Sequence, residues 1–432
     1  MASLDYARKK KALIYAVAFV IGVCCIVLSA CNKNTGIYDL SDINKDLELN
    51  HFIAKFIFVL YENIGNFGWT VVAFTVILKV ALSPLDIWQK LVTRKNAKAM
   101  ERMKPQLEIL KAKYGDDKQK FQQEQMALYK REKYSMLGAC VPTIVTLVVF
   151  FVIFAGFREM VGWKFAKDYQ DCYKVFDASM VELYEEEGID GYWKTYTETS
   201  EDTAVREAYA EFKNEAIEKS QAKVYEFYYS DEQVNSRSFL WIKNIFSPDS
   251  WSAEVPDYLT TTGKSGMATS RIEGIESSDY NMVMGDLLGQ GGWSGTGSWN
   301  GWLLLPVLSL ALNILSQKLM TMVQGNGEKK EKKSFKERWE KLKNLGKPAN
   351  GQENAEQQPV DQSQASMKMM TYMMPLITAV FALMYSSAFA LYMFVSSLVA
   401  TLFQLIFNLA FMIADKKKQN DPLKPKKVKA NK

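Results

Sequence analysis

The stretch GWTVVAFTVILKVALSPLDIW, residues 68–88, is an apolar run long enough to cross a bilayer, and it carries one cation, Lys79, near its middle. At ~1.5 Å of rise per residue, Lys79 lies roughly 12 to 16 Å from either end of the run, where a cation costs about 3 kcal/mol. The polar residues of the run recur at helical spacing and so share one face: Thr75, Lys79, Ser83 and Asp86. This pattern predicts a membrane helix whose lysine points into a wet, protein-lined space.

Charged and apolar residues are separated into blocks along the 432-residue chain, which is 48% hydrophobic and 23% charged with a net charge of +5. The single histidine, His51, lies outside the apolar runs, and no Cys-x-x-Cys pair accompanies it, so neither a zinc-type site nor a serine–histidine triad is expected. The glycine-rich stretch 289–301 has no strand before it and is typical of a loop rather than a nucleotide site. We therefore expect neither a cofactor nor an enzymatic active site.

The first 30 residues combine a basic patch with an apolar run and end in Leu28-Ser29-Ala30-Cys31. The last four residues resemble a bacterial lipobox, in which the cysteine is lipidated and becomes the first residue of the mature protein. The alternative is an uncleaved first transmembrane helix. Both interpretations place Cys31 outside the cytoplasm.

Residues 31–66 follow, and HFIAKFIFVLYENIG at 51–65 predicts an amphipathic helix in the outer membrane interface. Beyond the Lys79 helix, residues 89–134 are rich in charge and mostly basic, with a helix stop at Gly115 and a restart at Asp116 or Asp117. This predicts a helical hairpin, and the excess of cations places it in the cytoplasm. The apolar seam of the hairpin is predicted from Met103, Leu107, Leu110, Phe121, Met126 and Leu128.

Residues 137–157 predict a return through the membrane, so that 67–157 comprise two spans and the hairpin between them. Residues 158–300 are acidic, with about 26 Asp and Glu against about 13 Lys and Arg, as expected of an extracytoplasmic region. Within this region we expect amphipathic helices over 165–235 and an aromatic segment against the membrane at 239–251, while 250–300 is rich in Gly, Ser and Thr.

Three further spans are predicted over 301–412, at 301–322, 370–385 and from residue 389 onward. A polar cytoplasmic linker at 324–366 separates the first of these spans from the second. The tail, 413–432, is basic and therefore cytoplasmic. The chain is thus expected to be an all-α membrane protein with a five-helix core.

Polar stripes recur on several of these spans, which favours a shared hydrophilic groove within the membrane. The alternative for any one hydroxyl or amide is a hydrogen bond that joins neighbouring helices. The candidate groove residues are Thr75, Lys79, Ser83, Thr143, Thr146, Asn313, Gln317, Ser397, Thr401 and Gln404. Methionines in the hairpin, Met100, Met103 and Met126, suit an adaptable surface for hydrophobic clients, although ordinary core filling also explains them.

Five blocks of sequence, in order, resemble the core of the YidC/Oxa family of membrane protein insertases. They are GWTVVAFTVILKVALSPLDIWQK from residue 68, MKPQLEILKAKYGDDKQKFQQEQMALYKREKYSMLGACVP from 103, FLWIKNIFSPD from 239, LLLPVLSLALNILSQKLM from 303 and MKMMTYMMPLITAVFALMYSSAFALYMFVSSLVATLFQ from 367.

This resemblance implies a groove that is open to the cytoplasm and the lipid and whose charge, on Lys79, receives the polar part of a nascent membrane protein. It also implies that the hairpin catches the client first, through Met100, Met103, Leu107, Tyr114, Gly115 and Met126. The implied partners are nascent membrane proteins, lipids, the Sec translocon and, through the basic tail and hairpin, the ribosome. The implied location is the bacterial cytoplasmic membrane.

The sequence departs from the family pattern at several positions. Lysine at 79 stands where arginine is usual, and it keeps the charge without the planar fork. The segment at about 165–236 is an insertion beyond that pattern, and the short region before the core resembles the Gram-positive branch. Two other functions stay open: a small-solute or anion transporter that uses Lys79, for which internal repeats would be expected, and a scaffold that assembles partners.

Overall fold

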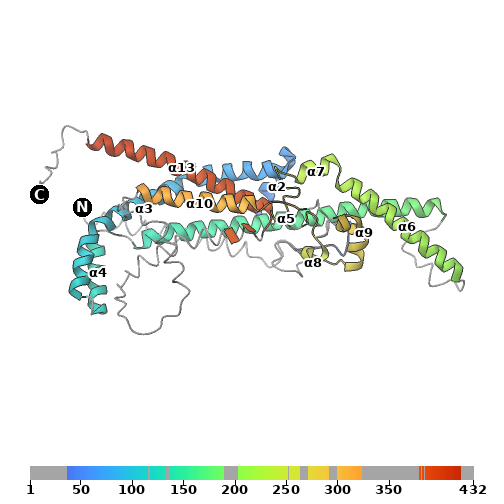
Figure 1. The fold of residues 1–432 in the computed structure, drawn as a ribbon, viewed down its shortest axis with the longest axis horizontal. Helices are drawn as coiled ribbons and strands as arrows, with labels where there is room; N and C mark the ends of the chain where they lie inside the picture. Colours follow the sequence, from blue (N-terminus) through green and yellow to red (C-terminus); the bar gives the residue numbers. More distant parts are fainter. Residues whose placement is uncertain are drawn as a thin grey trace, which may run out of the picture. The chain divides into compact units, whose positions relative to one another are not determined.

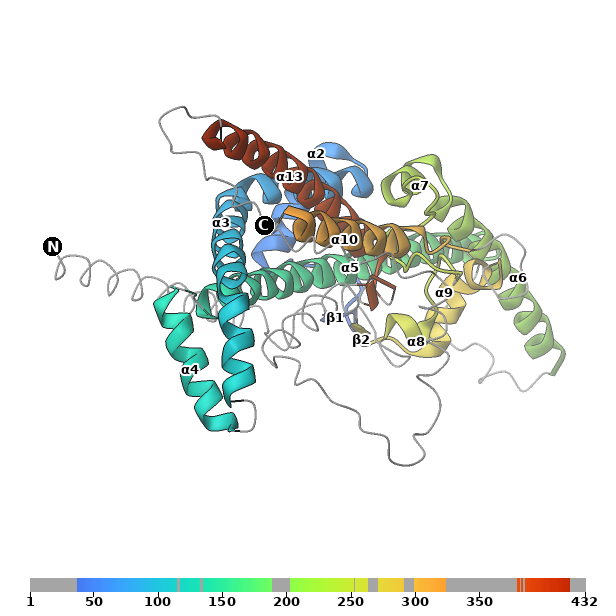
Figure 2. The ribbon, with the colours of Figure 1, turned by 60° about the vertical axis from the view of Figure 1, so that its left-hand side comes forward.

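The computed structural model describes residues 37–114, 117–132, 134, 136–188, 203–251, 253–262, 271–290, 299–323, 379–380, 382–383 and 385–419. Figure 1 labels the helices, which are Phe52–Ile64 (α2), Phe67–Tyr114 (α3), Lys118–Arg131 (α4), Met136–Glu186 (α5), Thr203–Tyr228 (α6), Asp231–Arg237 (α7), Tyr258–Thr261 (α8), Ser277–Gln290 (α9), Leu304–Val323 (α10) and Ser387–Gln419 (α13). The mostly helical architecture agrees with the predicted fold class. One small exception is the parallel pair of strands β1, Ile37–Asp39, and β2, Arg271–Glu273 (Figure 2).

The chain divides into two compact units. The first comprises residues up to 81, 141–309 and 379–396, and the second comprises 82–140, 310–378 and 397–432. Within the described ranges, α3 and the stretch Ser387–Ala410 of α13 are long and apolar enough to cross a membrane, and the apolar part of α10, Leu304–Leu319, is shorter. Most of the span predicted at 370–385 lies outside the described residues.

Helix α5 runs without a break through residue 157, where we expected the membrane span to end. The physical reason is visible in the sequence, because residues 158–186 contain no proline and carry an apolar face at helical spacing. That face is buried in the first unit and includes Phe165, Tyr169, Cys172, Phe176, Met180 and Tyr184. The acidic region therefore begins as a continuation of an apolar helix.

Helix α6 packs along the extended end of α5 (Figure 1). The Ser220 hydroxyl donates to the Ser179 hydroxyl over 3.0 Å, and Lys223 forms an ion pair with Glu182 at 2.7 Å. On its other side, Gln221 donates to the carbonyl of Met282 in α9 over 2.8 Å. The predicted helices of 165–235 are thus present and form a packed layer with α9.

Most of the loop expected at 289–301 lies outside the described residues, but regular structure precedes it in the Gly-, Ser- and Thr-rich stretch 250–288. Helices α8 and α9 and strand β2 lie there, and Tyr280 is buried with its ring stacked on Tyr169 at 5.4 Å between centroids. Glycine, serine and threonine are numerous in this stretch, but the apolar side chains Val283, Met284 and Leu287 are enough to bury one face of α9.

Residues 239–251, which we call the junction segment, connect the beginnings of three apolar helices. Its Phe246 ring packs on Phe67 at the start of α3 with centroids 4.4 Å apart. Its Asp249 carboxylate accepts backbone N–H groups at the start of α10, and its Ser247 carbonyl accepts both the N–H (2.8 Å) and the hydroxyl (2.7 Å) of Ser387 at the start of α13. The N-terminal ends of α3, α10 and α13 therefore meet at one place.

An aromatic core lies next to the junction segment in the first unit. Phe389 of α13 packs against Phe157 of α5 at 5.9 Å, and Phe74 of α3 packs against the same Phe157 at 5.9 Å between ring centroids. Tyr392 contacts both Phe74 and Phe157. These contacts bury Phe74, Phe157 and Phe389 almost completely and hold the three helices together at this end.

Helix α2 covers the segment in which an amphipathic helix was expected. One face, with Ile53, Ala54 and Ile57, is buried, while Phe52, Phe56 and Val59 are exposed. The helix begins at His51, whose ring nitrogen Nδ1 accepts the N–H of Ile53 over 3.2 Å. Glu159 of α5 fixes this end, since its carboxylate accepts the N–H groups of Asn50 and His51, each over 2.7 Å.

Candidate functional site

The polar face of α3 carries the charge on which the sequence analysis centred. Lys79 is half-buried in the first unit, and the helix continues through Pro84 without a break. Thr75, one turn earlier, is fully buried, and its hydroxyl donates to the carbonyl of Val71 in its own helix over 2.6 Å. Both residues stay predicted groove residues, and Thr75 is packed inside the first unit in this structure.

The polar stripe of α13 forms a ladder in the second unit. The Thr401 hydroxyl donates to the Ser397 carbonyl over 2.7 Å, and the Gln404 amide donates to the Asn408 side chain over 2.7 Å. Asn408 in turn donates to the carbonyl of Leu319 in α10 over 3.3 Å. All four side chains of the ladder are buried. In this structure the Asn408 end of the ladder joins α13 to α10, as the alternative interpretation of the stripe predicted.

The other candidate groove residues are placed as follows. Ser83 on α3 and Asn313 and Gln317 on α10 are half-buried. Thr143 and Thr146 fall within α5, but the structure does not describe their side chains. Cys31 and Gly115 lie outside the described residues. A groove that brings Lys79, Ser83, Asn313 and Gln317 together stays a prediction.

The second half of α3 and helix α4 lie side by side in the second unit (Figure 2). Their shared core consists of Ala99, Met103, Leu107, Leu128 and Tyr129, with Met100, Leu110 and Tyr134 packed against it. Asp117 caps α4 by accepting the N–H of Lys120 over 3.0 Å, in agreement with the predicted restart at this point. Spacing thus identified Met103, Leu107, Leu110 and Leu128 of this core but not Ala99 or Tyr129.

The methionines of these arms have different roles. Met103 is fully buried and Leu107 nearly so, which makes both of them part of the core between the arms rather than a surface for clients. Met126, which we predicted in the seam, is instead 46% exposed, and Ile109 of α3 is 67% exposed. At the far end of α3, the Tyr114 ring lies 5.2 Å from Lys113 Nζ and 5.4 Å from Lys120 Nζ. Among the predicted capture residues that the structure describes, Met126 is therefore exposed, whereas Met100 and Tyr114 are half-buried.

A network of buried polar groups at the junction segment was not predicted. Asn300 accepts the N–H of Asn244 over 2.7 Å and donates to the Asn244 and Pro248 carbonyls, each over 2.8 Å. Asn244 also donates to the Glu254 carbonyl over 2.9 Å. The sequence signal was weak, because Asn300 closes a glycine-rich stretch and its partners are about 50 residues away.

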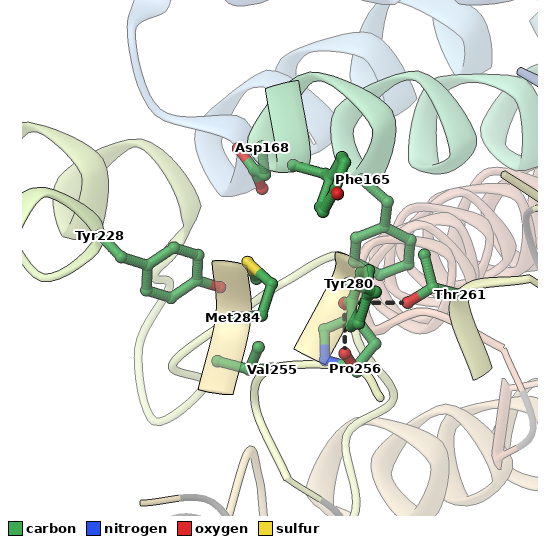
Figure 3. Close-up of a pocket in the computed structure, with 9 residues that line it drawn as sticks. Phe165, Asp168, Tyr228, Val255, Pro256, Thr261, Tyr280 and Met284 are labelled. Carbon is green, nitrogen blue, oxygen red and sulfur yellow. Dashed lines mark hydrogen bonds between the residues drawn. The ribbon is translucent and has the colours of Figure 1, made fainter. Parts of the chain in front are cut away.

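A small cavity in the first unit does not provide a client site. It is lined by Phe165, Asp168, Tyr169, Tyr228, Val255, Pro256, Thr261, Tyr280 and Met284 (Figure 3). About 10 Å³ is open to the centre of a water molecule, room for a single water. The Tyr280 hydroxyl donates to the Pro256 carbonyl over 2.7 Å, and burial raises the Tyr280 pKa above its ordinary value of 10. In the described part of the chain, no three His, Cys, Asp or Glu side chains converge in a way that could hold a metal ion.

Known proteins resemble this chain over the same segments. A sequence profile described as the 60Kd inner membrane protein matches residues 59–168 and 221–414, more than half of the chain. The unmatched stretch 169–220 lies within the expected insertion and corresponds to the end of α5 and most of α6.

Curated relatives named "Membrane protein insertase YidC" match shorter segments. The relative from Stenotrophomonas maltophilia (strain K279a) is 39% identical over 95 residues, which is 22% of this chain and 16% of the relative. The relative from Stutzerimonas stutzeri (strain A1501) is 37% identical over 114 residues, 26% of this chain and 20% of the relative. The relative from Legionella pneumophila (strain Corby) is 34% identical over 130 residues, 29% of this chain and 23% of the relative. The matched segments thus span less than a quarter of the length of these relatives, and the chain belongs to the 60Kd inner membrane protein family, the YidC/Oxa family.

Proposed function

We propose that this protein is a membrane protein insertase, which receives nascent hydrophobic polypeptides in a hydrophilic groove and releases them into the bilayer. The observation that carries the proposal is Lys79, a cation in the middle of the apolar run of α3, inside a segment that matches the family profile. A charge at that depth is costly, and contact with water and with an acidic client would offset the cost.

The proposed mechanism needs neither nucleotide nor covalent chemistry. A hydrated groove that reaches partway into the membrane shortens the apolar path that a polar client segment must cross. Burial of the apolar segment of the client in lipid, at about 25 cal/mol per Å², then drives insertion. The proposed groove residues are Lys79, Thr75, Ser83, Thr143, Thr146, Asn313, Gln317, Ser397, Thr401 and Gln404. Thr75, Ser397, Thr401 and Gln404 are buried in this structure, so a client reaches them only if the packing around them opens.

The paired arms of α3 and α4 are the proposed first contact for a client. The arms present Met126 and Ile109 as exposed apolar side chains beside a basic end at Lys113 and Lys120. Together with the basic tail, this end is also the proposed contact for ribosomal RNA, since clustered cations bind phosphates in a salt-dependent manner. Cooperation with the Sec translocon is part of the same proposal.

The proposed location is the bacterial cytoplasmic membrane, with residues 158–300 outside and the C-terminus in the cytoplasm. Support for this orientation comes from the junction segment, where α3, α10 and α13 all begin. Helices that begin at one place start on the same side of a bilayer. The cations of 89–134 and 413–432 favour the cytoplasm for the opposite side.

The test is reconstitution of the full chain alone into liposomes. We expect it to promote insertion of a single-span client with an acidic N-terminal tail and to leave anion flux at the level of empty liposomes. Anion conductance without insertion would instead favour the transporter that the intramembrane lysine also suggests. Neither activity, from protein that is folded and correctly oriented, would favour a scaffold.

A further inference from the structure

Exposed apolar side chains gather where the junction segment begins. Trp69, in the first turn of α3, packs edge-on against Phe239 with ring centroids 5.4 Å apart. The next residue, Leu240, is 71% exposed, and Trp69 itself is 58% exposed. Both side chains belong to the first unit, and both lie at the N-terminal end of an apolar helix.

A second aromatic group lies where the junction segment ends. The ring of Trp299 contacts Trp251 at 6.3 Å and Trp302 at 5.5 Å between centroids. Each of the three indoles remains between 50% and 56% exposed. Trp302 comes two residues before α10, so this group also marks the N-terminal end of an apolar helix.

The backbone at Leu240 gives independent support for a role of its side chain. Leu240 has a φ of 54°, in the left-handed region that favours glycine. Two backbone hydrogen bonds of 2.9 Å between Phe239 and Ile242 hold the turn. Leucine is unfavourable at this φ, and its apolar side chain is exposed. Both observations favour a role for the Leu240 side chain in contact with a partner.

The position of these residues identifies the kind of partner. Farther along α3 and α10 from the two groups, the exposed side chains are aliphatic. They are Val76, Ile77 and Val80 on α3 and Leu304, Val307 and Leu308 on α10. On the other side lie α6, α9 and the end of α5, the folded acidic layer of the first unit (Figure 1). Tryptophan is enriched at such a boundary because its ring is amphipathic and suits the headgroup level of a bilayer.

We propose that Trp69, Leu240, Trp251, Trp299 and Trp302 form an aromatic rim that binds the headgroup region of the outer leaflet and sets the depth of α3 and α10 in the membrane. The rim places the acidic layer outside the bilayer and the polar face of α3 within it. This proposal requires only that the chain lies in a bilayer, and it is independent of whether the protein inserts clients.

The test uses fluorine NMR of the full chain, labelled with fluorotryptophan, in phospholipid nanodiscs. Single Trp→Phe variants assign the signals of the four rim tryptophans and of Trp163, a control whose indole N–H donates to the Leu47 carbonyl over 3.0 Å. We expect a nitroxide on the lipid headgroup to broaden the rim signals beyond detection. A nitroxide near the end of the acyl chain and a water-soluble paramagnetic chelate should each broaden them less. Strong broadening by the chelate with none from either lipid nitroxide would overturn the proposal.

Leu240→Gly provides a second readout that folding alone would not move. Glycine suits the φ of Leu240, so we expect the unfolding temperature in detergent to stay the same or rise. The additional stability that the native chain gains in nanodiscs relative to detergent should fall in this variant. An unchanged gain would contradict the assigned contact of Leu240 with lipid.

Discussion

Asp249 is a single residue on which the start of α10 depends. Its carboxylate is fully buried and accepts the N–H groups of Trp302, Leu303 and Leu305 over 2.8, 3.1 and 2.8 Å. We predict that Asp249→Ala lowers the free energy of unfolding by about 2–4 kcal/mol, because the bonds to a charged acceptor and the cap are lost together.

The matched control is Asp257, which caps the short helix α8 by accepting the N–H of Thr260 over 2.8 Å. Asp257→Ala should cost no more than about 1 kcal/mol, since this cap is exposed. Denaturation in detergent, followed by circular dichroism, measures both variants. Equal losses would argue against a special role for Asp249.

His51 makes the stability of the first unit depend on pH. Burial lowers the pKa of His51 below its ordinary value of 6.5, and its Nδ1 must stay unprotonated to accept the N–H of Ile53. Below about pH 6.5, the unfolded chain therefore binds more protons than the folded chain. The free energy of unfolding then decreases by up to about 1.4 kcal/mol for each unit by which the pH is lowered. Above that pH, the contribution of His51 is complete.

Because His51 is the only histidine of the chain, the effect can be assigned to it. His51→Asn keeps a capping acceptor and removes the titration, so its unfolding free energy should change less between about pH 7.5 and about pH 5.5 than that of the native chain. Hydrogen exchange of α2 reports the same difference locally. Identical pH dependence of the two chains would refute this account.

At the scale of residues, spacing predicted which side chains share a face but not where their hydrogen bonds go. Thr75 and Thr401 were found on polar stripes, yet both hydroxyls bond within their own helices. A helical carbonyl four residues earlier is always within reach of threonine, and no spacing rule excludes it. Asn244 and Asn300 were missed because their contact is non-local.

The paired arms of α3 and α4 allow a test at the scale of elements. Met103 is fully buried between the arms and Met126 is 46% exposed, although both were predicted in the seam. Met103→Ala should cost about 2–5 kcal/mol through the cavity it leaves, and Met126→Ala should stay within about 0.5 kcal/mol. Hydrogen exchange across 99–131 measures the local loss. If Met126→Ala loosens the arms as much, the assigned core is incorrect.

The ladder of α13 supports a second prediction at this scale. Asn408→Leu removes the bond to the Leu319 carbonyl and leaves Gln404 without its acceptor. Hydrogen bonds between membrane helices contribute about 0.6 kcal/mol on average and at most about 1.7, so the loss should fall in that range. Unfolding of the variant in detergent measures it. A gain in stability would show that the ladder is retained for another reason.

Helices were predictable from apolar periodicity, whereas some of their bounds and the small sheet were not. The polar composition after residue 157 suggested a new segment, but α5 continues to Glu186 because nothing in that stretch stops a helix. Strands β1 and β2 have three residues each and pair across more than 230 residues of sequence, too short and too distant for a local pattern.

At the scale of the whole molecule, the chain combines a family core with an additional layer. The profile leaves out 169–220, and within the described part of that stretch the Tyr169 ring stacks on Tyr280 of α9 with centroids 5.4 Å apart. Five blocks of sequence in the same order as in the family core were sufficient to recognise the resemblance, which the family profile confirmed. The role of the added layer had no comparable signal, since its charge alone is typical of many surfaces.

The central claim is that the charge of Lys79 receives the acidic part of a client. Its most direct test measures the rate of client insertion by the reconstituted native, Lys79→Arg and Lys79→Glu proteins. Each protein is tested with two forms of one single-span client, one with an acidic tail and one in which Asn and Gln replace the acidic residues. We predict that Lys79→Arg matches the native protein and that Lys79→Glu slows only the acidic client, by about tenfold or more, equivalent to about 1.4 kcal/mol. Equal insertion of the acidic client by all three proteins would contradict the claim.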